Sequence, residues 1–205
     1  MKWLLGIMVA LCLNVGALAQ EVAPDVLVKN VTNEVLDIVR KDKDIQGANT
    51  RKAIELVDAK VLPHFNFTRM TQLAVARDWK QASPEQQKTL TTEFKTLLVR
   101  TYSKALTEYK NQTIDFRPFK MQAGETDVKV RTLVNQPGAK AIDLDYYLEK
   151  QSGGWKVYDI EVGGVSLVTN YRSEFANQVR QGGIDGLIAT LQTKNKTGET
   201  TAPKK

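Results

Sequence analysis

The stretch from Ser83 to Tyr109, SPEQQKTLTTEFKTLLVRTYSKALTEY, decides the fold because it holds the clearest helix start in the chain. Ser83 is a typical N-cap residue, Pro84 occupies the first helical position, and Gln86 follows the serine by three positions, as in a capping box. A wide stripe at helical spacing follows this start. It consists of Leu90, Phe94, Leu97, Leu98, Thr101, Tyr102, Ala105, Leu106 and Tyr109. The pattern predicts one long helix.

Upstream of this helix, apolar residues also recur at helical spacing. They are Val28, Val31, Val35 and Ile38, then Ile54, Val57 and Val61, then Phe65, Met70, Leu73 and Ala74. Asn49 and Thr50 precede the second of these helices and Pro63 ends it. The first half of the mature chain, from about Asp25 to Tyr109, is therefore predicted to be helical.

Downstream of Gln112 the apolar period changes to two residues, which indicates β-strands. The alternating runs are residues 114–116, 128–134, 142–148 and 155–162. An antiparallel register that pairs Val130 with Leu144 would set Lys129 opposite Asp145 and Arg131 opposite Asp143. We expect this register, because it leaves one apolar face and one charged face.

Helical spacing returns after Gly163–Gly164, breaks at Gly182–Gly183, and resumes over residues 184–191. Helices, a meander of strands and helices again predict an α+β fold, with helices packed on one face of a roughly four-stranded antiparallel sheet. Residues 194–205 carry no apolar period and are expected to form a disordered polar tail. The expected organisation is thus one α+β domain over residues 20–193.

Residues 1–19 have the features of a secretory signal peptide. Lys2 supplies the positive charge, an apolar stretch follows from Leu4 to Val15, and Ala17-Leu18-Ala19 provides the cleavage site. The apolar stretch is short for a membrane span. We therefore expect cleavage after Ala19 and location in the periplasm.

Cleavage also removes Cys12, the one cysteine of the chain, so the mature protein has no disulfide and no thiol ligand. The formal net charge of the whole chain is +6, and its Lys and Arg residues are dispersed. Nucleic-acid binding proteins cluster these residues into patches with aromatic residues between them. No nucleic-acid partner is expected.

Residues suited to catalysis are scarce. His64, the single histidine, stands between Pro63 and Phe65, where packing or capping is the commoner role. The glycine pairs lack the spacing of a phosphate-binding loop, and the acidic residues lack that of a calcium loop. We expect no catalytic residue, no metal site and no cofactor.

The long helix and the sheet share a large apolar and aromatic surface. Phe94, Leu98, Tyr102 and Leu106 on the helix can face Val130, Leu144, Tyr146 and Val157 on the strands. These side chains either fill a solid core or line an apolar pocket of the kind that binds small molecules. The pattern alone leaves both possibilities open.

Three segments resemble the MlaC family, the periplasmic toluene-tolerance or organic-solvent-resistance proteins. The first is Ser83 to Phe94 with Tyr102-Ser103-Lys104-Ala105-Leu106; the others are Gly164 to Phe175 and Gly183 to Ile188. Leu62-Pro63 also falls where that family has a leucine-proline pair. The likeness runs in one order from about residue 25 to 192, together with the signal peptide and the basic tail.

The resemblance implies a periplasmic carrier that holds the acyl chains of a phospholipid, its cargo, and keeps the headgroup near the mouth of the pocket. It implies transfer between an outer-membrane lipoprotein–porin complex and an inner-membrane ABC transporter complex with an MCE-type substrate-binding subunit. Such transfer maintains outer-membrane lipid asymmetry. It implies pocket positions at Tyr102 and Leu106, and at Val165 and Tyr171 after the sheet. Two alternatives remain: a periplasmic adaptor or chaperone with a solid core, and a hydrolase that acts on lipid through carboxylates.

The signal peptide gives a first testable prediction. Because Ala17-Leu18-Ala19 precedes polar Gln20 and Glu21, protein from the periplasm should begin at Gln20. Intact-mass measurement checks this, and a full-length, membrane-bound chain would contradict it.

Overall fold

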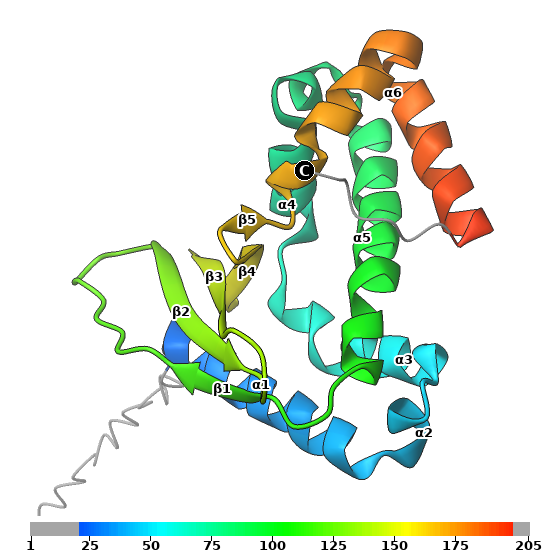
Figure 1. The fold of residues 1–205 in the computed structure, drawn as a ribbon. Helices are drawn as coiled ribbons and strands as arrows, with labels where there is room; N and C mark the ends of the chain where they lie inside the picture. The colour runs from blue at the N-terminus through cyan, green and yellow to red at the C-terminus, as the bar shows by residue number, and fades with distance from the viewer. Residues whose placement is uncertain (1–20, 199–205) are drawn as a thin grey trace, which may run out of the picture.

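The computed structural model describes residues 21–198, which form helices and one antiparallel sheet (Figure 1). The α-helices are α1 (Pro24–Lys41), α2 (Lys43–Gln46), α3 (Thr50–Lys60), α4 (Phe67–Val75), α5 (Pro84–Thr107) and α6 (Arg172–Thr197), with 3₁₀ turns η1 (Leu62–His64), η2 (Ala76–Gln81) and η3 (Thr169–Tyr171). The strands are β1 (Thr113–Phe116), β2 (Asp127–Asn135), β3 (Ile142–Gln151), β4 (Gly154–Val162) and β5 (Val165–Ser166). The α+β class is confirmed, with five strands instead of four. The expected signal peptide lies outside the described residues.

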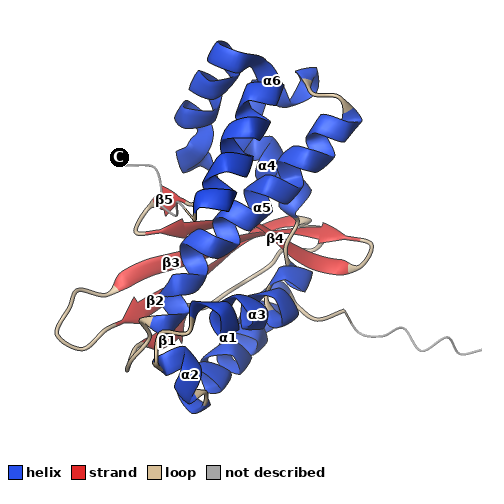
Figure 2. Ribbon diagram, turned by 90° about the vertical axis from the view of Figure 1, so that its right-hand side faces the viewer, coloured by secondary structure: helices blue, strands red, loops and turns tan. Residues whose placement is uncertain are grey.

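Helix α5 begins at the predicted capping box. The Gln86 amide donates to Ser83 Oγ at 3.2 Å, and the Ser83 amide donates to Gln86 Oε1 at 2.9 Å. The helix then runs between a group formed by α4 and α6 at one end and α2 with α3 at the other (Figures 1 and 2). Among the helices of residues 21–198, none combines the length and the apolar character that crossing a bilayer requires.

The strands follow the chain order β1-β2-β3-β4-β5, and each pairs antiparallel with the next. The expected register between β2 and β3 is wrong by two residues: Val130 pairs with Tyr146, and Arg131 pairs with Asp145. The apolar face is unaffected, because a two-residue shift preserves the alternation of side chains. Lys129 still reaches Asp145 along the diagonal, with 2.7 Å between Nζ and Oδ2.

The connection between β2 and β3 explains the shift in register. The Ala139 amide donates to the Gln136 carbonyl at 3.1 Å, and Gly138 has φ +78°. This geometry, with Pro137 before a left-handed glycine, suits a type II turn. Type II turns do not match the twist of a two-residue hairpin, so the chain continues through Lys140 before pairing resumes at Ile142.

Helices pack against both faces of the sheet. Val128, Val130, Leu148 and Val157 lie on one face and pack with Val28 of α1. Tyr147, one position from Leu148, points to the opposite face together with Tyr158, and both pack with the residues of α4, α5 and α6. The helices therefore contact both faces of the sheet. The sequence pattern predicts helices on one face only, and this part of the prediction is wrong.

A closed aromatic core joins α5 to α6. The Phe94 ring meets the Tyr171 and Phe175 rings edge-on, each with 5.1 Å between centroids, and all three are almost fully buried. Such pairs contribute about 0.5–1.5 kcal/mol beyond the burial of their area. The first half of α5 is thus held tightly to its neighbours.

Helix α6 breaks at Gly183, as predicted, where φ is +66°. The expected polar tail begins too early, because the helix continues through Thr197. Asn195 is buried; its side-chain amide donates to the main-chain carbonyl of Glu93 at 3.0 Å, and its main-chain carbonyl accepts from Arg100 Nη1 at 2.7 Å. Residues 194–197 are therefore held by hydrogen bonds to α5. Such bonds leave no apolar period in the sequence, so periodicity does not predict this last helical turn. Residues 199–205 lie outside the described part of the chain.

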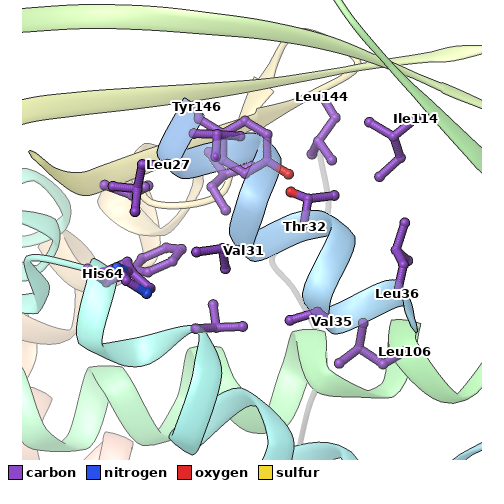
Figure 3. Close-up of a pocket in the computed structure, with 15 residues that line it drawn as sticks. Leu27, Val31, Thr32, Val35, Leu36, His64, Leu106, Ile114, Leu144 and Tyr146 are labelled. Atoms are coloured by element: carbon purple, nitrogen blue, oxygen red, sulfur yellow. The ribbon is translucent and has the colours of Figure 1, made fainter. Parts of the chain in front are cut away.

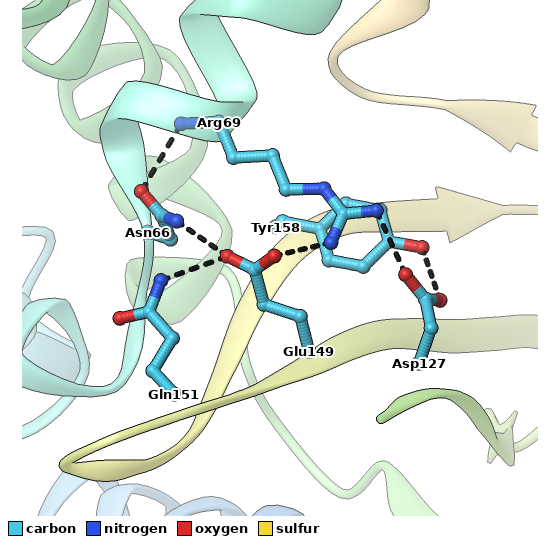
Figure 4. A network of polar contacts seen from close by, with 6 residues as sticks. All are labelled: Asn66, Arg69, Asp127, Glu149, Gln151 and Tyr158. Carbon is cyan, nitrogen blue, oxygen red and sulfur yellow. Dashed lines mark hydrogen bonds and ion pairs between the residues drawn. The ribbon is translucent and has the colours of Figure 1, made fainter. Parts of the chain in front are cut away.

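A polar network fixes α4 to the sheet (Figure 4). The Arg69 guanidinium pairs with Glu149 and with Asp127, at 2.7 Å for the latter, and stacks on the Tyr158 ring 3.6 Å from its centroid. The Asn66 side chain donates to Glu149 and also caps α4 by accepting from the Arg69 amide at 3.0 Å. One arginine therefore links a helix start to three strands.

This network gives a second prediction, for Glu149→Gln. Burial alone would raise the pKa of Glu149, but hydrogen bonds from Asn66, Arg69 and Gln151 outweigh burial and hold it below its usual value. A depressed folded pKa adds stability that is present above the unfolded pKa, about 4.3, and is lost as the pH falls through the folded value. We expect the variant to lose about 1–3 kcal/mol of unfolding free energy at neutral pH, and less in acid.

The measurement is denaturant unfolding as a function of pH. Glu55→Gln is the matched control, because Glu55 is exposed and lies 3.9 Å from its nearest partner, Arg51. An equal loss in both variants, or a loss for Glu149→Gln that does not shrink in acid, would contradict the prediction.

Candidate functional site

A cavity of about 250 Å³ lies between α1 and the sheet (Figure 3). Its walls come from α1, the segment around η1, the C-terminal half of α5 and the three strands β1, β3 and β4. The lining residues are Leu27, Val28, Val31, Thr32, Val35, Leu36, Val61, His64, Phe65, Leu106, Ile114, Leu144, Tyr146, Val157 and Ile160. Almost all of these side chains are apolar.

A second cavity, of about 310 Å³, adjoins the first and extends between α3, α4 and α5. Its lining residues are Val35, Val57, Val61, Leu62, Phe65, Phe67, Met70, Leu98, Val99, Tyr102, Ser103, Leu106, Leu144, Ile160 and Leu167. Six residues line both spaces: Val35, Val61, Phe65, Leu106, Leu144 and Ile160. The two cavities therefore adjoin along a shared wall, and together they are called the branched apolar interior below.

Local structure explains why these residues point inward. Leu98, Tyr102 and Leu106 are spaced by four positions and so share one face of α5. Leu144 and Tyr146 are two positions apart on β3 and so share one face of the sheet. Phe65 is held between α5 and the sheet because its segment forms a β-bridge to Val157 of β4.

Few polar atoms face this interior. The hydroxyls of Thr32 and Tyr146 point toward one another across the first cavity (Figure 3). Burial raises the pKa of Tyr146, and a hydrogen bond with Thr32 acts in the opposite direction. Because the two hydroxyls satisfy each other, the wall behaves as an apolar surface.

Among residues 21–198, the walls of the two cavities carry one imidazole, His64, and no carboxylate. Burial and the charge of Lys156 lower the pKa of His64, while Glu34 acts against them. Within the described residues, no cluster of His, Cys, Asp and Glu is suited to hold a metal ion.

An unfilled interior of this size is costly. At about 24 cal/mol per Å³, a cavity of about 250 Å³ would cost about 6 kcal/mol if it were sealed and dry, and this partly open cavity costs less. Whole domains are stable by only about 5–15 kcal/mol. A water-filled state gains little, because apolar walls offer water no hydrogen bonds. The interior is therefore suited to an apolar occupant.

The structure places the ten sequence-predicted site residues in two groups. Six line the cavities: Leu98, Tyr102, Leu106, Leu144, Tyr146 and Val157. Four do not: Phe94, Val130, Val165 and Tyr171. Phe94 and Tyr171 belong to the closed aromatic core, Val130 is buried between strands and α1, and Val165 lies half-buried on β5 at the sheet edge. Helical spacing gave the face of α5 that lines the cavities, but not the position along that face where the closed core ends and the cavity begins.

Sequence reasoning missed the contribution of α1. Val28, Val31 and Val35 were recognised as one helical face, but no pocket role was assigned to that face. The same helix adds Leu27 and Leu36, which makes the apolar stripe wider than one buried seam needs. The width of this stripe is the sequence signal that could have identified α1 as a wall of the cavity.

A family model described as MlaC protein matches residues 29–193. The intermembrane phospholipid transport system binding protein MlaC of Haemophilus influenzae is 25% identical over 175 residues, which cover 84% of this chain and 82% of that protein. The toluene tolerance protein ttg2D of Pseudomonas putida is 26% identical over 163 residues, which cover 79% of this chain and 75% of that protein.

A solved structure of a phospholipid-binding protein from Ralstonia solanacearum, in complex with a phospholipid, is also similar. The TM-score is 0.80 and the sequence identity is 41%. The match covers 86% of this chain and 99% of that one. Sequence and fold thus agree over nearly the same part of the chain.

The cavity walls give a third prediction, which compares the same substitution at two positions of α5. Leu97→Trp enters the closed core, where Leu97 is 2% exposed, and should cost about 1–3 kcal/mol by overpacking. Leu106→Trp enters open space and should leave the stability of the empty protein near that of the wild type. Denaturant midpoints of delipidated protein measure both, and equal losses would show that Leu106 faces solid core.

Proposed function

The chain belongs to the MlaC family, and we propose that it is a phospholipid-binding transport protein whose cavities hold acyl chains. The observation that carries the proposal is the branched apolar interior, about 250 and 310 Å³, with six residues common to both parts. A branched space with apolar walls suits the hydrocarbon tails of a diacyl lipid. The names of the Haemophilus and Ralstonia proteins, which refer to phospholipid transport and phospholipid binding, support it.

The physical task of such a carrier is to shield hydrocarbon from water. Each buried methylene gains about 0.8 kcal/mol relative to water, so free phospholipid is almost absent from an aqueous compartment. A cavity as apolar as the bilayer makes loading and unloading nearly balanced in free energy. Net direction must then come from the donor and acceptor complexes, such as an ATP-driven one.

Location and partners extend the proposal. We propose that the mature chain works in the periplasm after cleavage at Ala19, in residues that the structure does not describe. We further propose that it exchanges lipid with an inner-membrane ABC transporter complex through an MCE-type subunit, and with an outer-membrane lipoprotein–porin complex. The family membership and the signal-like N-terminus support this assignment.

We propose a binding role and not an enzymatic one. An adaptor with a solid core gains no support from a protein with cavities of this size. A lipid hydrolase that works through carboxylates needs them beside the bound lipid, and the walls of these cavities contribute none from residues 21–198. Asp159, a buried carboxylate, instead accepts from Ser166 Oγ at 2.5 Å and from the Ile160 amide at 2.8 Å in the turn to β5.

The test is to purify the protein and extract it with organic solvent. We expect stoichiometric intact phospholipid from the wild type and a marked loss of lipid from Leu106→Trp, whose ring occupies the shared wall. Lys104→Trp is the matched control, because Lys104 lies on the same helix and its side chain is 68% exposed. Mass spectrometry identifies the extract.

Three outcomes would contradict the proposal. A wild type without lipid would favour an adaptor. A Leu106→Trp variant that keeps all of its lipid would show that the acyl chains do not lie at the shared wall. Lyso-lipid with fatty acid in place of intact phospholipid would favour a hydrolase.

A further inference from the structure

A depression lined by both polar and apolar side chains adjoins the first apolar cavity. It measures about 710 Å³ and lies between the start of α1, the η1 segment and the hairpin turn that joins β3 to β4. Leu27 and His64 line both this depression and the apolar cavity. The hydrocarbon interior therefore meets a polar surface at these two side chains.

The depression contains two lysines in different situations. Lys150 is neutralised by Glu21, with 2.8 Å between Nζ and Oε2. The Lys156 ammonium donates to the Pro63 carbonyl at 2.6 Å, and within residues 21–198 no carboxylate lies within ion-pair distance of it. Lys156 is thus the cation of this depression whose charge has no acidic partner there.

His64 adds no second positive charge at neutral pH. Burial and the nearby Lys156 lower its pKa, and Glu34, which is itself paired with Lys60 at 2.6 Å, opposes this only in part. An anion in the depression would therefore meet one uncompensated charge, that of Lys156.

A different polar depression lies at the C-terminal end of α5 and includes Glu108, Lys110 and Gln112. It shares no lining residue with either apolar cavity in the described part of the chain. It also carries a lysine, so charge alone does not distinguish the two depressions. Continuity with the apolar interior does.

We propose that the depression at Lys156 is the headgroup site, where the Lys156 ammonium contacts the phosphodiester of a phospholipid whose acyl chains enter past Leu27 and His64. The assignment rests on the proposed function and adds the orientation of the lipid: the acyl chains lie inside the cavities and the phosphate lies at η1. Because the contact is exposed, its contribution is modest and is weakened by salt. Lys156 recognises the phosphate, which is common to phospholipids, and not the alcohol attached to it.

The experiment compares two lipids with the same tails. Delipidated protein is equilibrated with phosphatidylcholine vesicles that carry trace labelled dipalmitoylphosphatidylglycerol or dipalmitoylglycerol, which lacks the phosphate. The ratio of the two lipids loaded isolates the phosphate contact, and loading of dipalmitoylglycerol reports that the cavity is intact. Lys156→Gln should lower this ratio about three- to fivefold, as expected for loss of one exposed charged contact.

Three controls make the result specific. Lys156→Arg keeps the charge and should keep the ratio within about twofold of the wild type. Lys110→Gln removes the same charge at the other depression and should leave the ratio unchanged. Inorganic phosphate has the same anion chemistry but no acyl chains, and it should not displace the labelled phospholipid.

The outcomes separate this proposal from the proposed function. If the wild type loads neither lipid, the proposed function fails and the headgroup site fails with it. If both lipids load and Lys156→Gln leaves the ratio unchanged, only the headgroup site is overturned. It is also overturned if Lys110→Gln lowers the ratio, or if inorganic phosphate displaces the lipid and so reveals a simple anion site.

Discussion

Uneven packing along α5 is the constraint on which the rest of the structure depends. In its first half, Phe94 is locked against Tyr171 and Phe175, and it is completely buried. In its second half, Tyr102 and Leu106 face open space. A straight helix fixed at one end cannot lean toward α1 to fill that space without breaking the aromatic contacts. The closed core therefore preserves the cavity.

The opposite wall is held by a separate set of contacts. Arg69 binds Asp127 and Glu149 from the start of α4, which fixes the adjoining segment that carries Phe65. Phe65 also bridges to Val157 of β4. Because hydrogen bonds and ion pairs are directional, they hold the segment at a set distance from α5 where apolar contacts alone would favour collapse. Stability is concentrated in the core and the network, and the space between them is left for an apolar occupant.

This division suits a carrier. The free-energy cost of an empty apolar interior is removed when hydrocarbon fills it, so cargo completes the packing of the protein. The polar depression beside Leu27 and His64 gives that interior an asymmetric end. Such an end would orient a lipid without requiring a strong bond to its headgroup. Weak headgroup contacts and nearly balanced tail transfer both favour release to a partner.

The sequence by itself determined most of the helices, most of the strands and the break in α6, because capping, periodicity and glycine are local signals. Ser83 and Gln86 formed the expected capping box, and Gly183 interrupted α6 as expected. The β2–β3 register was missed although the turn around Gly138 that sets it is local. Tertiary structure decided the last helical turn at Asn195, which depends on hydrogen bonds to α5. It also decided the site. Phe94 and Leu106 lie on one predicted stripe of α5. Periodicity gives the side of the helix on which they lie, but not the distance from the helix to the elements that face it. That distance, set by contacts between segments remote in sequence, makes Phe94 core and Leu106 cavity wall.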